Sequence, residues 1–379
     1  MGASGGPVGV GVIGAGNISD TYLQNLSSFP DVRVLAVADI DVERARSQAD
    51  RYAIPLAGDV DVVLDDPAVD IIVNLTIPAT HVAVSEAAIA AGKHVWSEKP
   101  IGIDRESSRR LLERADAAGL RVGIAPDTVL GPGLQTAKRA IAAGAIGRPL
   151  FAQTSFQWQG PEIFHPNPAF LYARGAGPLL DMGPYYVSAL VHLFGPVATV
   201  AALGLRGVES RAVQVGPLAG TEFPVEIPST VSVLFDFERG GQAQSLYSTD
   251  SPLMRQGVVE ITGTEGTLVL PDPNTFGGAI TITRALAEVV VPPAPVIQQV
   301  DEVALEGVVV GRGLGLLDMA RAIREGRPHV ASGELGLHVL DTLLSIEESV
   351  EAHRFVTVES TVGELASIPA DFDPFAATL

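Results

Sequence analysis

Residues with the types and spacing needed to hold a dinucleotide stand at three places in the first hundred positions. They are Gly14, Gly16 and Ser19 in a G-x-G-x-x-S sequence, Asp39 at the end of a later apolar run, and Lys99 at the end of another. Glycines between a strand and a helix permit a tight turn and let a pyrophosphate approach the backbone. A carboxylate about 20 residues further on binds the ribose hydroxyls. Together these residues predict a dinucleotide-binding site, with Lys99 where the reactive end of the dinucleotide would lie.

The segment after the glycine turn has helical spacing and begins at Asn17 and Ile18. A helix N-terminus presents free N–H groups to phosphates. The Asp39 carboxylate repels a 2′-phosphate, so the sequence favours NAD over NADP. Arg44 and Arg46 are expected to lie too far along the next helix to reverse this preference, although they keep NADP possible. The alternative is a glycine turn with a helix-capping aspartate in a fold that binds something else.

The elements that must position these residues alternate regularly up to about Pro126. Repeated strand–helix units with short connections predict a parallel sheet covered by helices on both faces, here a Rossmann domain over residues 1–126. Glycines after the helical segments suit helix C-termini. The predicted strands are 8–13, 32–38, 70–76, 94–98 and 121–125, and the predicted helices are 17–29, 41–52, 82–91 and 105–118.

Residues 127–379 have a different pattern. Alternating strands from about 197 to 270, with turn signals at 239–241 and 263–266, predict a large and mostly antiparallel open sheet. Helices are expected at 134–143, briefly within 179–193, and at 315–324 and 335–353, while the Pro-rich stretch 272–300 is ambiguous. The predicted class is therefore α/β, an N-terminal Rossmann domain followed by a C-terminal α+β domain that binds the substrate.

Three short segments resemble motifs of the glucose–fructose oxidoreductase / inositol dehydrogenase / MocA (Gfo/Idh/MocA) family, and the match extends over nearly the whole chain. Residues 76–81 resemble its Thr-x-Pro-x-x-His segment, and 98–100 resemble its Glu-Lys-Pro signature. Residues 181–185 resemble its Asp-x-Gly-x-His segment, with Tyr185 in place of the histidine. The same replacement occurs in branches resembling glucose–fructose oxidoreductase and dihydrodiol dehydrogenase, where tyrosine is the expected proton donor or acceptor.

The resemblance implies further expectations. The open sheet of the second domain often forms an oligomer interface, the late helices pack back on the Rossmann domain, and substrates are sugars, cyclitols or related polyols. Pro78 would shape the cofactor wall through its rigid φ, and His81 either lines the nicotinamide pocket or caps and packs. The implied cofactor contacts are Thr76, Pro78, His81, Glu98 and Lys99.

Lys99, Tyr185 and Asp181 are the predicted catalytic residues. A tyrosine has an ordinary pKa near 10, and a neighbouring ammonium lowers that pKa by stabilising the phenolate. Lys99 would provide the ammonium and also hold the substrate hydroxyl. Asp181 stands four residues before Tyr185, on the same face of a helical turn, and would orient the lysine or bind a second hydroxyl. The alternatives are a surface lysine, a core tyrosine and a helix N-cap, and the adjacent Tyr186 is expected to pack.

Further substrate contacts are predicted at Asp127, Trp158 and His165. Asp127 follows the last Rossmann strand, so it either binds a sugar hydroxyl or caps a loop. Trp158 and His165, with Arg174 nearby, combine an aromatic ring with polar neighbours, which suits one face of a sugar.

Composition excludes several classes of function. The net charge of −19 argues against nucleic acid and anionic membranes as partners. The chain has no cysteine, which excludes disulfides and thiol chemistry, and its seven histidines are dispersed, so no metal is expected. No apolar run reaches the roughly 20 residues of a membrane span. We expect a cytoplasmic homo-oligomer, a dimer or a tetramer.

These observations predict an oxidoreductase that transfers a hydride between NAD and a hydroxyl or keto carbon of a sugar, cyclitol or related polyol. One alternative is a dihydrodiol-type dehydrogenase of the same fold. The other is a non-catalytic NAD-binding sugar sensor, against which the intact Lys99 and Asp181 weigh.

Overall fold

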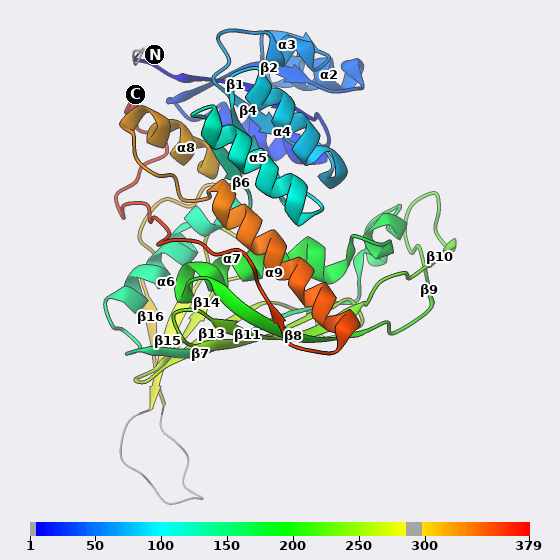
Figure 1. Ribbon diagram of the computed structural model, residues 1–379, viewed down its shortest axis with the longest axis vertical. Helices are drawn as coiled ribbons and strands as arrows, with labels where there is room; N and C mark the ends of the chain where they lie inside the picture. Colours follow the sequence, from blue (N-terminus) through cyan, green and yellow to red (C-terminus); the bar gives the residue numbers. More distant parts are fainter. Residues whose placement is uncertain (1–4, 286–297) are drawn as a thin grey trace, which may run out of the picture. The chain divides into compact units, whose positions relative to one another are not determined.

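The structure, a computed structural model, describes residues 5–285 and 298–379. The chain folds into two compact units (Figure 1). The first comprises Met1–Pro132, Glu306–Leu340 and Glu364–Leu379, and the second comprises Gly133–Leu305 and Asp341–Gly363. The chain therefore leaves the first unit and returns to it twice.

A parallel six-stranded sheet with the strand order β3-β2-β1-β4-β5-β6 forms the centre of the first unit. Its inner strands are apolar and fully buried, as a sheet covered on both faces requires. This order confirms the predicted Rossmann fold. The strands are β1 (Val8–Ile13), β2 (Val32–Ala38), β3 (Leu56–Gly58), β4 (Ile71–Asn74), β5 (His94–Ser97) and β6 (Val122–Ile124).

Helices α1 (Asn17–Leu26) and α2 (Val42–Tyr52) pack against each other, as do α4 (His81–Ala90) and α5 (Arg105–Ala117). Asp41 caps α2 and Asp104 caps α5 through side-chain hydrogen bonds. The short β3 and the four-residue α3 (Asp61–Leu64) were not predicted, since they are too short for a period to be visible.

Helix α8 (Leu314–Glu325) and the last residues of the chain complete the first unit. Arg321 on α8 forms a buried ion pair with Asp31, with Nε 2.7 Å from Oδ2. The hydroxyl of Thr378 donates to the same oxygen at 2.7 Å. A β-carbon on Gly123 of β6 would come 3.0 Å from the sulfur of Met319, which shows how closely α8 packs on this sheet.

A nine-stranded sheet dominates the second unit, in the order β16-β15-β14-β13-β7-β12-β11-β8-β17. Among the described residues of this sheet only β7 and β12 pair in parallel, so the prediction of a mostly antiparallel sheet is confirmed. The strands are β7 (Pro149–Gln157), β8 (Val197–Leu205), β11 (Thr230–Phe237), β12 (Gln242–Ser248), β13 (Arg255–Gly263), β14 (Thr267–Leu270), β15 (Ile280–Ala285), β16 (Gln298–Val303) and β17 (Val356–Thr357).

Helix α7 (Gly177–Phe194) packs on β7, β11 and β12 and is almost entirely buried from Gly183 onward. It is longer than the short helix predicted, because Gly183 and Pro184 interrupt the sequence pattern without ending the helix. α6 (Pro132–Ala142) precedes β7, and α9 (Gly333–Ala352) passes from the first unit into the second. The ambiguous stretch 272–300 supplies β15 and the start of β16, while 286–297 lie outside the described residues.

A separate hairpin of β9 (Ser210–Ala212) and β10 (Glu222–Pro224) lies outside the large sheet. Its own small core consists of buried Tyr172, Val213, Phe223, Val225 and Ile227. Tyr172 comes from the segment between β7 and α7, so the hairpin packs on that segment.

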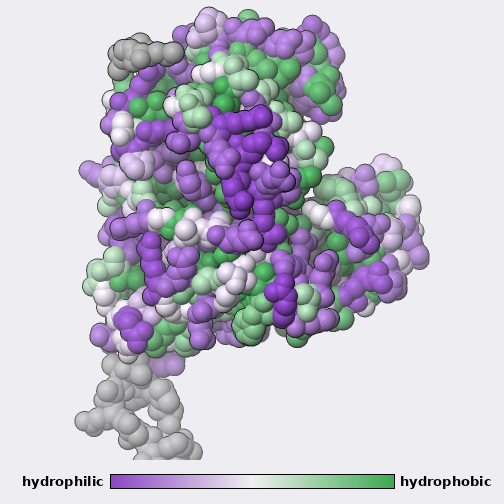
Figure 2. Space-filling model, viewed as in Figure 1, coloured by the Kyte–Doolittle hydropathy of each residue, from purple (hydrophilic) through white to green (hydrophobic). Residues whose placement is uncertain are grey.

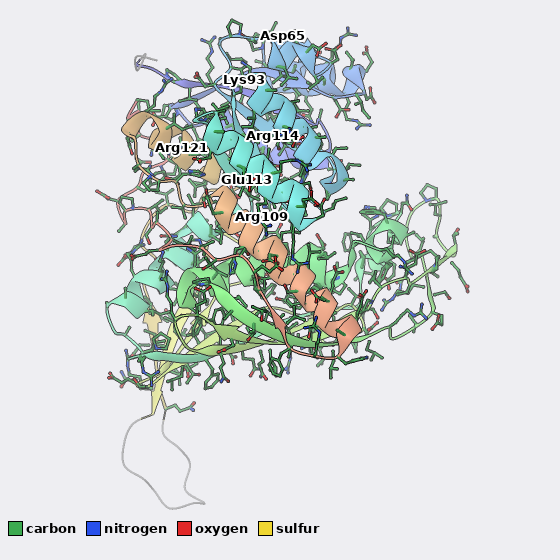
Figure 3. All side chains as sticks on the ribbon, in the orientation of Figure 1. Asp65, Lys93, Arg109, Glu113, Arg114 and Arg121 are labelled. Atoms are coloured by element: carbon green, nitrogen blue, oxygen red, sulfur yellow. The ribbon has the colours of Figure 1, made fainter. Side chains whose placement is uncertain are left out.

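Hydrophilic residues gather over α5 on the face seen in Figure 2. Figure 3 labels Arg109, Glu113 and Arg114 along this helix, and Arg114 pairs with Glu86 of α4 at 3.0 Å. This outer surface is suited to solvent. Among the described residues, no helix is both long and apolar enough to cross a membrane.

Candidate dinucleotide and substrate sites

The turn between β1 and α1 has the geometry that a pyrophosphate needs. Gly14 has φ +105°, and a β-carbon there would lie 2.7 Å from the Leu75 carbonyl group, so only glycine fits. Among the described residues, nothing lies within 4 Å of the place where a β-carbon on Gly16 would stand. Within the same part of the chain, no side chain caps α1 at Gly16. The open space and the uncapped N–H groups beginning at Asn17 and Ile18 fit a bound phosphate.

Asp39 follows β2, and its carboxylate is fixed beside this turn. One oxygen accepts the Ala15 N–H at 2.7 Å and the other accepts the Asp41 N–H at 2.9 Å. The side chain is 7% exposed, so its orientation is set before any ligand arrives. Each oxygen has a second lone pair for a ribose hydroxyl. The residues present therefore fit a dinucleotide whose ribose lies at Asp39.

Arg44 lies closer to this carboxylate than the sequence suggested. Its Nη1 is 3.7 Å from Asp39 Oδ1, and its Nη2 is 3.4 Å from Asp41 Oδ2. Its place along the helix does not keep Arg44 away from Asp39, because helical side chains point back toward the N-terminus. Arg46 pairs instead with Glu43.

His81 connects two of the segments that carry predicted cofactor contacts. Its Nδ1 lies 2.7 Å from the Pro100 carbonyl oxygen and its Nε2 lies 3.0 Å from that of Thr76. The ring is 1% exposed. This geometry favours the capping and packing alternative, in which His81 fixes the backbone around Thr76 and Pro100 while Pro78 opens the short turn before it.

Glu98, directly after β5, is held by a buried polar cluster. Its Oε1 accepts the Tyr22 hydroxyl at 2.8 Å, and the Trp96 indole N–H donates to that hydroxyl at 3.3 Å. Its Oε2 accepts the Lys99 N–H at 3.1 Å. Burial raises the pKa of Tyr22, which keeps this phenol a donor. Glu98 therefore fixes the backbone at Lys99. The hydrogen bond from Tyr22 that holds Glu98 was not predicted from the sequence.

Asp127 is completely buried, and its Oδ2 accepts the N–H groups of Gly313 at 2.7 Å and Gly315 at 3.3 Å. These groups lie at the start of α8. Burial raises the pKa of Asp127 to about 6. The contacts favour the capping alternative over contact with a sugar hydroxyl.

Asp181 and Tyr185 lie one turn apart on α7, as their spacing predicted. Asp181 is exposed, whereas Tyr185 is buried. The neighbouring Tyr186 is fully packed, because its hydroxyl donates to the Ser155 carbonyl at 3.3 Å and accepts the Gly257 N–H at 2.9 Å. The expectation that Tyr186 packs is confirmed.

Trp158 and His165 belong to a row of aromatic rings in the second unit. Ring centroids are 5.8 Å apart for Phe156 and Trp158, 5.4 Å for Trp158 and Phe164, and 5.5 Å for His165 and Phe170. Phe164 and Phe170 are each 57% exposed. The Trp158 indole N–H has no hydrogen-bond partner in the part of the chain that the structure describes. We call Trp158, Phe164, His165 and Phe170 the aromatic row.

The row begins near α7, because Phe156 also packs on Tyr186 with centroids 6.3 Å apart. Sequence reasoning found Trp158 and His165 but not Phe164 or Phe170, whose separation of six residues matches no period. Arg174 is exposed, and only its backbone N–H, which reaches Glu226 at 3.4 Å, has a described contact. Over residues 5–285 and 298–379, no group of histidines, aspartates and glutamates is placed to hold a metal ion.

Comparison with known proteins identifies both parts of the chain. Residues 8–125 match the model of an oxidoreductase family with an NAD-binding Rossmann fold, and 134–269 match that of the GFO/IDH/MocA C-terminal domain. Trans-1,2-dihydrobenzene-1,2-diol dehydrogenase from Macaca fascicularis is 26% identical over 288 residues, which are 75% of this chain and 80% of the relative. An uncharacterised oxidoreductase, YrbE, from Bacillus subtilis is 27% identical over 266 residues, 68% of this chain and 71% of the relative.

Solved structures share the fold. An NAD-binding oxidoreductase from Klebsiella pneumoniae has a TM-score of 0.78 at 26% identity, covering 93% of this chain and 99% of that one. A levoglucosan dehydrogenase in complex with NADH and L-sorbose has a TM-score of 0.79 at 21% identity, covering 94% and 100%. This chain belongs to the Gfo/Idh/MocA family of NAD-binding oxidoreductases.

Proposed function

We propose that this protein oxidises one hydroxyl of a cyclic polyol, or reduces the corresponding ketone, with NAD as the hydride carrier. The bound nicotinamide would accept or donate the hydride. Gly14, Gly16, Asn17 and Ile18 would hold the pyrophosphate, and Asp39 the ribose. The nicotinamide does not take the proton of the substrate hydroxyl, so a side chain of the protein must accept or donate it.

Lys99 and Tyr185 are proposed to move that proton. A phenolate accepts a proton from a hydroxyl, and a nearby ammonium makes the phenolate accessible near neutral pH. Asp181, one turn before Tyr185, would bind a second hydroxyl or orient the ammonium. Thr76 and Pro78 would line the cofactor, while Glu98 and His81 fix the backbone that carries Lys99.

The aromatic row is the single observation that supports the proposed class of substrate. Aromatic faces stack on the C–H face of a sugar ring and on a planar carbocycle alike. The exposed rings of Phe164 and Phe170 offer apolar surface for such a ring. A ring-shaped substrate with several hydroxyls fits these groups.

A dihydrodiol is the second candidate. The row is mainly hydrocarbon, and the relatives that are 26–28% identical over 68–75% of this chain include several trans-1,2-dihydrobenzene-1,2-diol dehydrogenases. A sensor that binds NAD without turnover is the third reading. It is disfavoured because Lys99 and Tyr185 both carry groups able to transfer a proton.

The test is absorbance of reduced nicotinamide with NAD and, separately, levoglucosan, D-glucose, myo-inositol or trans-1,2-dihydrobenzene-1,2-diol. Turnover with a sugar or cyclitol supports the polyol assignment. Turnover with the dihydrodiol alone moves the assignment to the second candidate. Tight NAD binding with no turnover of any compound, in either direction, contradicts both enzymatic readings.

We further propose a cytoplasmic homo-oligomer that forms through the large sheet. One sheet face carries apolar side chains at the surface, namely Phe151, Leu203, Leu205, Leu234 and Phe355. A concavity of about 850 Å³ on this sheet is lined by Leu203, Leu234 and Phe355 together with polar residues such as Gln153 and Gln244. Sedimentation velocity of Leu234→Glu should show a smaller species than the wild type, and an unchanged mass would contradict this interface.

A further inference from the structure

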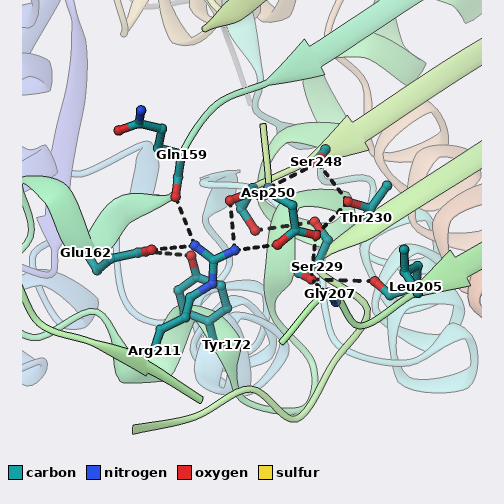
Figure 4. A network of polar contacts seen from close by, with 11 residues as sticks. Gln159, Glu162, Tyr172, Leu205, Gly207, Arg211, Ser229, Thr230, Ser248 and Asp250 are labelled. Atoms are coloured by element: carbon teal, nitrogen blue, oxygen red, sulfur yellow. Dashed lines mark hydrogen bonds and ion pairs between the residues drawn. The ribbon is translucent and has the colours of Figure 1, made fainter. Parts of the chain in front are cut away.

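Arg211, on the strand β9 of the small hairpin, lies at the centre of a polar network in the second unit (Figure 4). Its guanidinium donates to the carbonyl oxygens of Gln159 and Thr249, both at 2.9 Å, and pairs with the carboxylates of Glu162 and Asp250. The side chain is only 12% exposed. Its two terminal nitrogens thus meet two carboxylates and two carbonyls, which fixes the position of the guanidinium. Its Nε–H is buried and has no hydrogen-bond partner among the described residues.

One side of the network lies within the segment that carries the aromatic row. Gln159 and Glu162 stand between Trp158 and Phe164. The Tyr172 hydroxyl, just beyond Phe170, donates to Glu162 at 2.6 Å, and the guanidinium stacks over the Tyr172 ring at 5.1 Å. Arg211 therefore contacts this segment at both ends of the row.

The other side of the network lies at the end of the large sheet. Asp250 accepts hydrogen bonds from the hydroxyls of Ser229 and Thr230, both at 2.7 Å. The backbone of Trp158 pairs with the residues on either side of Asp250. Its N–H donates to the Ser248 carbonyl at 3.1 Å, and its carbonyl accepts the Ser251 N–H at 3.0 Å. The network thus joins the row, the hairpin and the sheet.

We infer that Arg211 is a positioning residue for substrate recognition: it holds the aromatic row in its binding arrangement before the substrate arrives. This inference rests on the proposed function, in which the row contacts the substrate. A surface that is already ordered loses less conformational entropy on binding and so binds more tightly. Only a guanidinium has the planar set of donors that meets four acceptors and an aromatic face together.

The experiment compares Arg211→Met with Arg206→Met, a matched control. Arg206 lies just before the same hairpin but is 44% exposed and pairs with the exposed Glu209. With levoglucosan and trans-1,2-dihydrobenzene-1,2-diol as substrates, Arg211→Met should raise KM about 10-fold and change kcat less than about twofold. Its Kd for NAD should equal that of the wild type, and Arg206→Met should match the wild type in all three quantities. Arg211→Lys should restore part of the loss in KM.

A second readout needs no substrate. The chain has two tryptophans, and Trp96 is fully buried, so acrylamide quenching reports mainly on Trp158. Quenching should rise in Arg211→Met and stay at the wild-type level in Arg206→Met. If Arg211→Met does not fold, Glu162→Gln removes one ion pair of the network and should raise both KM and quenching in the same direction, to a smaller extent.

Variants of the aromatic row distinguish a failure of the positioning role from a failure of the proposed substrate site. If Phe164→Ala and Trp158→Phe raise KM while a folded Arg211→Met leaves KM and quenching unchanged, the positioning role is wrong and the substrate assignment stands. If Phe164→Ala and Trp158→Phe leave KM unchanged, the row does not contact substrate, and the proposed substrate site itself is wrong.

Discussion

The dinucleotide turn of the first unit and the aromatic row of the second differ in what holds their side chains. Asp39 is fixed by N–H groups of Ala15 and Asp41, which belong to the turn and to its own strand end. The segment that carries Trp158 and Phe164 is bound at Gln159 and Glu162 by Arg211, some fifty residues later in the chain. A site that local backbone geometry builds is visible in a sequence, whereas one that distant side chains build is not.

The largest expected effect concerns Lys99 and Tyr185, the two residues proposed to move the proton. Lys99→Met and Tyr185→Phe should each lower kcat by about 10²- to 10⁴-fold, the usual contribution of general acid–base catalysis. The Kd for NAD in Tyr185→Phe should remain at the wild-type value. Circular dichroism and melting curves check the fold. Normal turnover in either folded variant would remove that residue from the proposed chemistry.

The next largest effect is expected at Asp39. It tests whether residues close together in the sequence set the preference between NAD and NADP. Asp39→Ser should weaken NAD binding and strengthen NADP binding, each about tenfold, because the carboxylate no longer repels a 2′-phosphate and Arg44 is released to bind it. Isothermal titration with both dinucleotides measures this change. The gain for NADP should disappear in Asp39→Ser/Arg44→Met but persist in Asp39→Ser/Arg46→Met. Equal behaviour of the two double variants would show that Arg44 is no closer to the cofactor than Arg46.

The smallest effect concerns Asp127, and it depends on pH. Its pKa in the folded state, about 6, lies above the ordinary value, so the folded state binds more protons than the unfolded state between about pH 4 and pH 6. The contribution of Asp127 to the free energy of unfolding therefore falls as pH rises through this window. Between pH 5 and pH 7 the fall should be about 1 kcal/mol.

Urea unfolding of the wild type and Asp127→Asn at pH 5, 6 and 7 isolates this term. The variant is the necessary reference because burial lowers the pKa of His94 to about 4, and that shift has the opposite effect on stability over the same range. The free energy of unfolding of the wild type, minus that of Asp127→Asn, should decrease as the pH rises. A constant difference would contradict the raised pKa of Asp127.

Much of the first unit was predictable because its signals are local. A run of apolar residues, a G-x-G turn and a carboxylate at a strand end are all readable within thirty residues. The contact between Arg44 and Asp39 was not predictable in this way, because the Arg44 side chain extends back along the helix toward Asp39. Distance along a helix does not measure where a long side chain ends.

Less of the second unit was predictable because its contacts join distant segments. The parallel pairing of β7 with β12 joins residues about ninety positions apart, and no pattern within either strand shows it. Glu162, Asp250 and Arg211 each read as an ordinary surface charge in the sequence. Only their convergence in space shows that they form one network.

The first unit is built from three separate segments of the chain, which affects how it folds during synthesis on the ribosome. Asp31 and Asp127 emerge early, but the groups that satisfy them, in Arg321, Thr378 and the backbone of Gly313 and Gly315, emerge more than 180 residues later. Until then two carboxylates that will be buried have no partners. The nascent Rossmann sheet therefore stays incomplete until eight strands of the nine-stranded sheet, β7 to β16, have been synthesised.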